Sequence, residues 1–134
     1  VGVARKLGEA MALHDFFETW PDAKKYFRMV PVYLDVSDRS VKRRLLARKQ
    51  CIGCKKIIAG LTEEAYLEAC LRCGGHLAKR KDDTHTAIDS RLREYRKYVL
   101  PVLNYFRKHN MLLTVNGEQS REKVHREAMR KLGL

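Results

Sequence analysis

The four cysteines of this chain stand in two pairs, each with the Cys-x-x-Cys spacing of a metal-binding turn. Cys51 and Cys54 form the first pair, Cys70 and Cys73 form the second, and 15 residues separate the pairs. Four thiolates are the ligand set of a tetrahedral structural zinc site, which leaves no open position for catalysis. Two disulfides or four free thiols are the alternatives. Because we find no secretory signal, we expect a reducing compartment, which disfavours disulfides.

A charged group follows the second cysteine pair, and zinc binding does not explain it. Arg80 is followed by Asp82 and Asp83, while His76 lies closer to the cysteines as a bystander. Arginine pairs bidentately with phosphate and stays charged, and a phosphoryl group in transfer is stabilised mainly by positive charge. Neighbouring aspartates can hold such an arginine in orientation before phosphate arrives. The group therefore indicates chemistry on phosphate.

Composition narrows the class of protein. The chain has 134 residues, about the size of one domain, and 45% of them are hydrophobic, enough for a modest core. Its net charge of +12 points to polyanionic partners such as nucleotides, nucleic acid or acidic lipid, with a plain lysine-rich surface as the alternative. No apolar run reaches the length of a membrane span. We expect a cytoplasmic protein without a membrane partner.

Hydrophobic periodicity predicts the elements that must position these residues. Their order is helix, strand, helix, cysteine-bearing insert, helix, strand, helix, which is typical of an α/β fold with parallel strands joined by crossovers. The first strand is apolar enough to be buried on both faces, and Pro101 should kink or split the third helix. Helices are expected at 7–17, 38–50 (capped by Ser37), 83–106 and 120–132 (ended by Gly133), a short helix capped by Thr62 in the insert, and strands at 29–36 and 111–117.

Several stretches in order resemble a known family. From about Val30 onward the chain is similar to the second half of a bacterial-type adenylate kinase with a zinc-bearing lid. The stretches are VYLDVS, RLLARKQCIGC, CLRCGGHLAKRKDD, AIDSRLREYRKYVLPVLNYF and VNGEQSREKV, and GVARKLGEAMAL near the start resembles the family's Gly-Phe-Pro-Arg-Thr segment. The resemblance implies the C-terminal part of a P-loop nucleoside monophosphate kinase fold. Core α/β segments would span 1–49 and 80–134, and a zinc-binding lid would span 50–79.

The resemblance also implies an activity and a role for each matching residue. The activity is phosphoryl transfer between ATP and AMP with magnesium, by a nucleotide-binding transferase of nucleotide biosynthesis. The transferred group would be held by the catalytic residues Arg48, Arg80 and Arg91. Substrates and their clamps would involve Arg5 (monophosphate), Glu9 (acceptor adenine, in place of the family's Gln), Arg44 (donor adenine and phosphates), Asp82 and Asp83 (ordering the arginines), and Gln119 in the loop at the donor adenine.

One departure limits the expectation for this chain by itself. No GxxxxGK[ST] sequence occurs in the 134 residues, so no phosphate loop binds the β-phosphate or anchors magnesium. We therefore expect the isolated chain to be inactive. We also expect it to be a monomer. Which monophosphate is accepted stays open. The alternative function is a noncatalytic basic zinc module that binds RNA or a protein assembly. Tyr95 and Tyr98 stand among basic residues, as base-stacking rings would, but their helical spacing favours a place at the edge of the core.

Overall fold

The computed structural model describes residues 4–134 except for the side chain of Lys24. Residues 1–3, which belong to the segment that resembles the Gly-Phe-Pro-Arg-Thr sequence, lie outside the described part. The chain forms two compact units. We call Val1–Val36 together with Arg93–Leu134 the core unit, and Ser37–Leu92 the cysteine unit. Each is described by itself.

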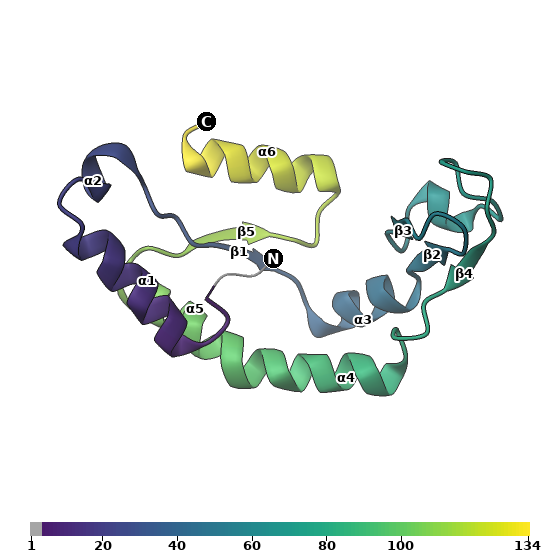
Figure 1. Ribbon diagram of the computed structural model, residues 1–134, viewed down its shortest axis with the longest axis horizontal. Helices are drawn as coiled ribbons and strands as arrows, with labels where there is room; N and C mark the ends of the chain where they lie inside the picture. Colours follow the sequence, from purple (N-terminus) through teal and green to yellow (C-terminus); the bar gives the residue numbers. More distant parts are fainter. Residues whose placement is uncertain (1–3) are drawn as a thin grey trace. The chain divides into compact units, whose positions relative to one another are not determined.

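Two parallel strands organise the core unit, with Val32 opposite Leu113 and Asp35 opposite Asn116. Figure 1 shows α6 on one side of this strand pair and α1 and α5 on the other. The predicted α/β fold with parallel strands and flanking helices is therefore confirmed. The elements are α1 (Leu7–Thr19), α2 (Ala23–Tyr26), β1 (Val32–Asp35), the π-helical turn η2 (Tyr95–Val99), α5 (Leu100–Lys108), β5 (Leu113–Asn116) and α6 (Arg121–Leu132).

The last helix begins and ends where its sequence signals lie. The Ser120 hydroxyl accepts a hydrogen bond from the Lys123 amide, which caps the first turn of α6. Gly133 adopts a left-handed conformation with φ of 78° and terminates the helix. The helix predicted around Pro101 changes to a π-helical pattern over Tyr95–Val99, just before α5 begins. Pro101 lies in the first turn of α5. The break expected near this proline is thus a change of helix type.

The apolar cluster of the core unit is small. Ala10 of α1 packs with Val102 and Phe106 of α5. The prediction that the first strand is buried on both faces is wrong, because Val32 is 44% exposed and Leu34 is 50% exposed. In the described part of the unit this strand has a single neighbour, β5, so little covers its side chains. The apolar residues Val124, Ala128 and Leu132 of α6 are only half-buried.

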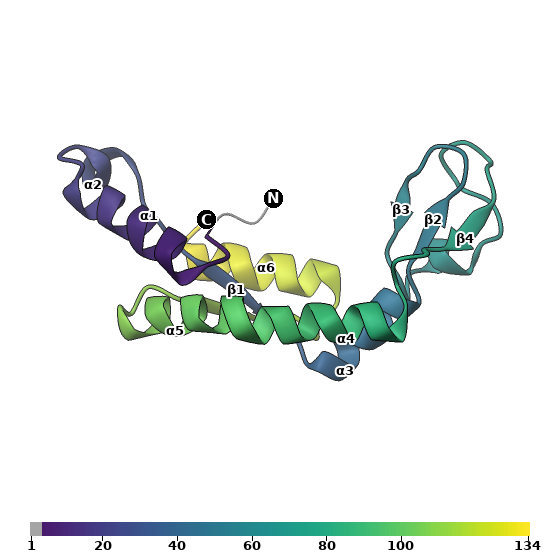
Figure 2. The same ribbon diagram turned by 60° about the horizontal axis from the view of Figure 1, so that its bottom comes forward.

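The cysteine unit contains a three-stranded antiparallel sheet in the order β3-β2-β4, seen most openly in Figure 2. Ser37 caps its first helix as predicted, since its hydroxyl accepts from the Ser40 amide at 3.3 Å. The elements are α3 (Asp38–Leu46), β2 (Lys49–Cys51), β3 (Ile57–Ile58), the 3-10 helix η1 (Glu63–Tyr66), β4 (Leu77–Lys79) and α4 (His85–Glu94).

Two predicted boundaries and one predicted side-chain cap in this unit are wrong. The helix expected to reach residue 50 ends at Leu46, because Lys49–Cys51 pairs with two strands instead. Thr62 does not cap the next helix through its side chain; its hydroxyl donates to the Ala59 carbonyl at 2.8 Å. Helix α4 starts at His85 and not at residue 83, since Thr84 accepts from the Ala87 amide.

No described helix combines the length and the apolar character that a membrane span requires.

Candidate metal centre and arginine cluster

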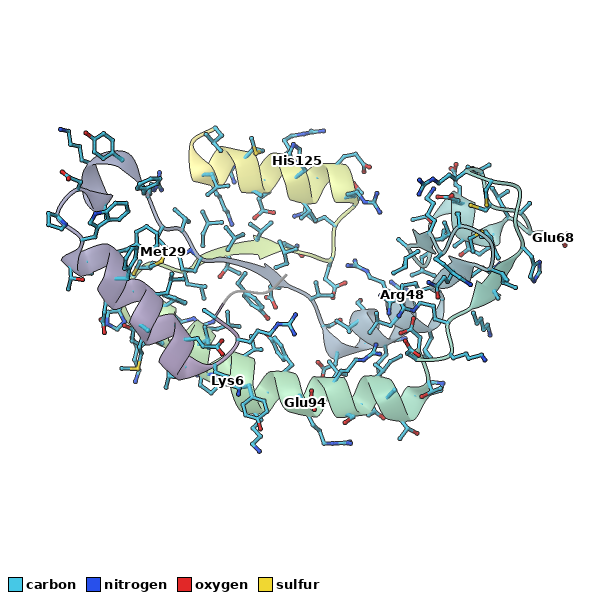
Figure 3. All side chains as sticks on the ribbon, viewed as in Figure 1. Lys6, Met29, Arg48, Glu68, Glu94 and His125 are labelled. Carbon is cyan, nitrogen blue, oxygen red and sulfur yellow. The ribbon has the colours of Figure 1, made fainter. Side chains whose placement is uncertain are left out.

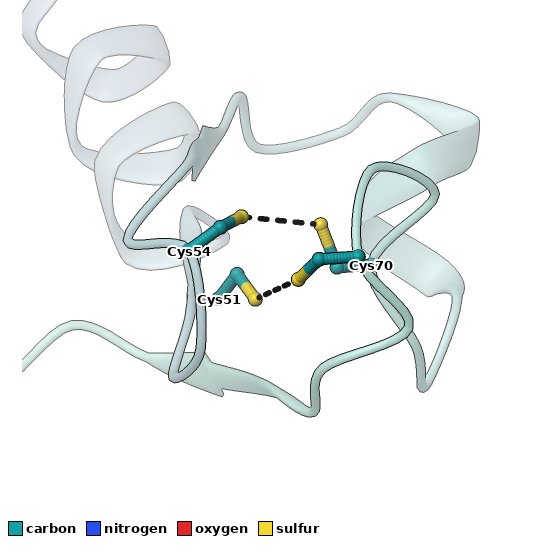
Figure 4. A group of neighbouring side chains, drawn as sticks. Cys51, Cys54 and Cys70 are labelled. Atoms are coloured by element: carbon teal, nitrogen blue, oxygen red, sulfur yellow. Dashed lines mark hydrogen bonds between the residues drawn. The ribbon is translucent and has the colours of Figure 1, made fainter.

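The four cysteine sulfurs come together at one point of the cysteine unit. All four Sγ atoms lie within 4.8 Å of one another. Two contacts join the two pairs: Cys51 to Cys73 at 3.5 Å and Cys54 to Cys70 at 3.8 Å, drawn as dashed lines in Figure 4. Sulfurs bound to one tetrahedral zinc at about 2.3 Å lie about 3.8 Å apart. The cluster therefore has the dimensions of a four-thiolate metal site, and it is the only such group found among the described residues.

Backbone amides point at these sulfurs in a repeated pattern. Cys54, Cys70 and Cys73 each accept a hydrogen bond from the amide two residues further along the chain. The Gly75 amide, followed by the Cys51 and Cys54 thiols, lowers the pKa of Cys73 to about 6. Amide donors favour anionic sulfur. The environment thus suits the thiolate, the form that binds metal, at Cys70 and Cys73. At Cys54 the Lys56 amide acts in the same direction, but burial and the neighbouring cysteines raise its pKa to about 11.

The two turns have the same backbone shape. The residue after the second cysteine is left-handed in both: Lys55 has φ of 60° and Gly74 has φ of 69°. The next glycine, Gly75, has a different reason to lack a side chain, because a Cβ there would lie 2.9 Å from Cys51 Sγ and 3.3 Å from Cys73 Sγ. These residues fit a metal held by Cys51, Cys54, Cys70 and Cys73.

Three arginines meet at one buried carboxylate, Asp83, whose side chain is 2% exposed. Arg48 grips it with two hydrogen bonds, from Nε to Oδ2 at 2.8 Å and from Nη2 to Oδ1 at 2.6 Å. Arg91 Nη1 donates to Oδ1 at 3.2 Å, and Arg80 Nε lies 3.8 Å from Oδ2. Figure 3 shows Arg48 where α3 gives way to the sheet. The three positive side chains therefore converge within one unit.

The charges of this cluster stabilise one another. The hydrogen bonds from Arg48, with smaller contributions from Arg91 and Arg80, lower the pKa of Asp83 despite burial, which acts the other way. The Asp83 carboxylate in turn raises the pKa of Arg48. Asp83 is therefore ionised in the folded chain at neutral pH, and it holds the arginines in orientation.

One donor of the cluster is unused. Arg80 Nε is buried and makes no hydrogen bond to any described residue, although Nη2 of the same side chain donates to Asp82 Oδ2 at 3.0 Å. Buried donors normally have a partner. Arg80 also lines an open hollow of about 470 Å³ together with the basic residues Lys55, Lys79 and Lys81.

The other predicted site residues lie in both units. The Asp82 backbone carbonyl accepts a hydrogen bond from Arg91 Nη2 at 3.2 Å. Arg44 is half-buried near the end of α3. In the core unit, Glu9 caps α1 by accepting from the Arg5 and Lys6 amides at 2.9 Å and 3.2 Å. Gln119, also in the core unit, donates from Nε2 to the Asn116 carbonyl and to Glu127. The substrate roles of these residues stay predictions.

Two supporting residues were missed from the sequence. Lys56 gives its amide to Cys54 and pairs its ammonium with Glu64 at 2.7 Å, which fastens η1 to the first cysteine turn. A basic residue two positions after a cysteine pair was the available signal. Gly60 is needed because a Cβ there would lie 2.2 Å from the Arg44 carbonyl oxygen, a long-range approach with no local signal.

Comparison with known proteins gives a consistent result. An adenylate kinase of Petrotoga mobilis is 34% identical over 97 residues, which cover 72% of this chain and 45% of that protein. An adenylate kinase of Thermosipho africanus is 30% identical over 129 residues, 96% of this chain and 58% of that protein. An adenylate kinase of Chlamydia trachomatis serovar D is 30% identical over 124 residues, which cover 92% of this chain and 47% of that protein. The chain spans about half the length of these curated relatives. No model of a protein family matches it.

Proposed function

Because the chain belongs to the adenylate kinase family, we propose that it serves phosphoryl transfer between ATP and AMP by supplying a metal-stabilised lid and the arginines that clamp phosphate. The observation that carries this proposal is the convergence of Arg48, Arg80 and Arg91 on Asp83. An isolated surface arginine says little about function. Three that share one buried carboxylate make a preassembled site for negative charge.

The chemistry of such a site follows from electrostatics. A phosphoryl group in transfer spreads negative charge over its equatorial oxygens, and guanidinium groups stabilise that charge when they are already in place. Asp83 keeps the three guanidiniums close together, although like charges repel. Oxygens of the transferred group would take the free Arg80 Nε and the solvent-facing side of Arg91, which is 46% exposed. Asp82 and Asp83 are then positioning residues.

Zinc is the metal we assign to Cys51, Cys54, Cys70 and Cys73. Bound there, it would supply structural cross-linking, because four thiolates leave no position for substrate. Arg48 precedes the first ligand by three residues and Arg80 follows the last by seven. Ordering of the sulfurs therefore orders the two segments that carry these arginines.

Magnesium would enter with ATP, and no described residue is assigned to it. The chain contains no phosphate-loop sequence, so we propose that the 134 residues by themselves do not turn over ATP and AMP. The thiolate cluster requires a reducing compartment, which supports a cytoplasmic place of action.

A chimera tests the proposal directly. This chain would replace the 129 matched residues of the Thermosipho africanus adenylate kinase, and ADP formation from ATP and AMP would be followed in the presence of magnesium. We expect turnover at about 1–100 per second, the range typical of kinases. Changing Arg48, Arg80 or Arg91 to Ala should lower kcat by about 10²–10³, as removal of a donor to a developing charge does.

The exposed Arg72 supplies the matched control, because it belongs to the same unit and has no contact with Asp83 among the described interactions. Arg72→Ala should leave kcat unchanged. A folded chimera without activity would argue against a catalytic role. Binding of single-stranded RNA to the same variants tests the alternative function. If the Arg48, Arg80 and Arg91 variants weaken RNA binding no more than Arg72→Ala does, the cluster has no special part in RNA binding.

A further inference from the structure

Two sulfur contacts cross from one cysteine turn to the other. Cys51 Sγ and Cys73 Sγ lie 3.5 Å apart, and Cys54 Sγ and Cys70 Sγ lie 3.8 Å apart. A disulfide needs an S–S distance of about 2.0 Å, which a modest rotation of two side chains could reach from 3.5 Å. Pairing between the turns is therefore within reach of small movements.

Exposure makes the two cross-turn pairs unequal. Cys73 is exposed, whereas Cys51 and Cys70 are buried and Cys54 is intermediate. A small oxidant from solvent reaches Cys73 first, and the buried Cys51 sulfur lies 3.5 Å from the Cys73 sulfur. In the other pair the more accessible member, Cys54, is still partly covered, and its partner is 3.8 Å away.

We propose that Cys73 and Cys51 form an oxidation site, at which hydrogen peroxide converts the metal centre into a lid closed by one disulfide. The inference goes beyond phosphoryl transfer and rests on the metal centre proposed above. Its core is the arrangement of an exposed sulfur beside a buried one on the facing turn. It assigns these two residues a reversible modification in addition to metal binding.

The reaction balances with peroxide as the oxidant. The Cys73 sulfur attacks one peroxide oxygen, the O–O bond breaks, one water leaves, and Cys73 becomes a sulfenic acid. The Cys51 sulfur then attacks the Cys73 sulfur, the S–S bond forms, the S–O bond breaks, and a second water leaves. Two thiolates, one peroxide and two protons from solvent thus give one disulfide and two waters, with two electrons passing to oxygen. A metal that has lost two of four ligands is released.

The disulfide would join the same segments that the metal joins. Cys51 ends β2, the central strand of the sheet, and Cys73 lies in the turn that leads to β4. Ala65, Ile58 and Leu77 pack around Cys51 and Cys70 in the small cluster beneath. A link from Cys51 to Cys73 keeps the second turn against this cluster without metal. The oxidised unit should therefore stay folded.

The test uses the full chain, purified with its metal. Zinc content is measured first, so that a chain without zinc counts against the metal centre on its own. Hydrogen peroxide is then added, and zinc release is followed with a chromogenic chelator. Remaining thiols are alkylated and the chain is cut with trypsin, which cleaves after Arg72 and so separates Cys70 from Cys73. We expect loss of two thiols, release of the bound zinc, and a peptide 50–55 linked to peptide 73–79 through Cys51.

A reductant should restore four thiols and zinc binding, since the product is a disulfide. A first product that links peptide 50–55 to peptide 57–72, a disulfide within 50–55, or sulfinic acid without a link would overturn the proposal.

Paired variants give an independent measure. Cys54→Ser with Cys70→Ser keeps the proposed pair, whereas Cys51→Ser with Cys73→Ser keeps the other pair, and each removes two ligands. The first variant should lose its thiols to peroxide faster. Equal rates, or a faster second variant, would contradict the proposal. The mapping on the unchanged chain remains decisive if either variant unfolds.

Discussion

The core unit and the cysteine unit are stabilised by different interactions. Buried apolar side chains hold the core unit together: Ala10, Val102 and Phe106 pack with one another, and partly buried apolar residues surround them. In the cysteine unit, two of the five residues in the buried cluster are the cysteines Cys51 and Cys70. The insert between α3 and α4 is too short to bury enough apolar surface to order itself, so sulfur ligands and ion pairs stabilise it instead.

The difference means that each unit should respond to its own kind of perturbation. Metal loss, oxidation and acid act on thiolates and carboxylates, which the cysteine unit concentrates around its cluster and around Asp83. Loss of apolar volume acts on the helices of the core unit. A perturbation that destabilises one unit and leaves the other intact would support this division. A perturbation aimed at one unit that destabilises both would contradict it.

Metal removal should have the largest effect. Apparent binding free energies of structural zinc are about 10–16 kcal/mol at neutral pH, and that energy is folding energy when the site has little core of its own. Chelation, or Cys51→Ser, should abolish hydrogen-exchange protection of the β2, β3 and β4 amides and spare those of α1 and α5. Ile52→Ser is the control, because Ile52 lies within the same turn but is exposed. Loss of protection in both units together would contradict the division.

A cavity in the core unit should have the next largest effect. Phe106 is 4% exposed in the apolar cluster, and Phe→Ala changes in cores cost about 3–5 kcal/mol. Phe106→Ala should lower the denaturant midpoint of the core unit, and zinc affinity measured by chelator competition should not change. The exposed neighbour Arg107 gives the control, since Arg107→Ala should shift stability by about 0.5 kcal/mol or less. A parallel loss of zinc affinity in Phe106→Ala would show that the units are not separable.

The parts of this organisation that were predictable from the sequence depend on local chemistry. The spacing of the cysteines predicted a four-sulfur cluster because two short turns suffice to build it. Ser37, Ser120 and Gly133 predicted helix ends, since a cap involves only neighbouring backbone.

Features that depend on distant partners were not predictable in the same way. Residues 47–50 look helical, but pairing of Lys49–Cys51 with β3 and β4 overrides that preference. Gly60 is required by the close approach of the Arg44 carbonyl. The exposure of Val32 and Leu34 depends on how many strands cover them, and the apolar pattern of a strand does not contain that number. Arg48 and Arg91 both donate to Asp83. We expected these residues to act together only because of the family resemblance, since nothing in their spacing alone requires it.

Acid should weaken the cysteine unit through Asp83. The folded-state pKa of this carboxyl lies below its ordinary value, mainly because Arg48 donates to it. Its contribution to stability is therefore present above the ordinary pKa of about 3.9 and is lost as pH falls through the lowered folded-state pKa. Asp83→Asn should cost about 2–3 kcal/mol at pH 7, in the range of charged hydrogen bonds, and should flatten the fall in stability at low pH.

Asp82→Asn is the matched control for that measurement, because the Asp82 side chain is 63% exposed and forms its ion pair with Arg80. Exposed pairs contribute about 0–1 kcal/mol. Thermal unfolding of the three proteins between pH 7 and pH 3 gives the comparison. If Asp82→Asn and Asp83→Asn have the same profile, Asp83 is not the anchor of the cluster.

The smallest predicted effects concern the backbone of the two cysteine turns. Gly74 and Lys55 occupy the same left-handed position, and a Cβ at Gly74 would meet no atom within 4 Å. Gly74→Ala should therefore cost only the conformational term, about 1 kcal/mol, because left-handed backbone disfavours any residue with a Cβ. Lys55→Gly relieves the same strain, but glycine also makes the unfolded chain more flexible, so the net gain should stay below about 1 kcal/mol. Chelator competition should thus find weaker zinc binding in Gly74→Ala and equal or slightly tighter binding in Lys55→Gly.

Gly75→Ala provides the contrast, since its Cβ would press on Cys51 Sγ and Cys73 Sγ and should weaken zinc binding far more than Gly74→Ala. Equal losses at Gly74 and Gly75 would mean that backbone strain, and not the space around the sulfurs, governs how tightly these turns hold metal.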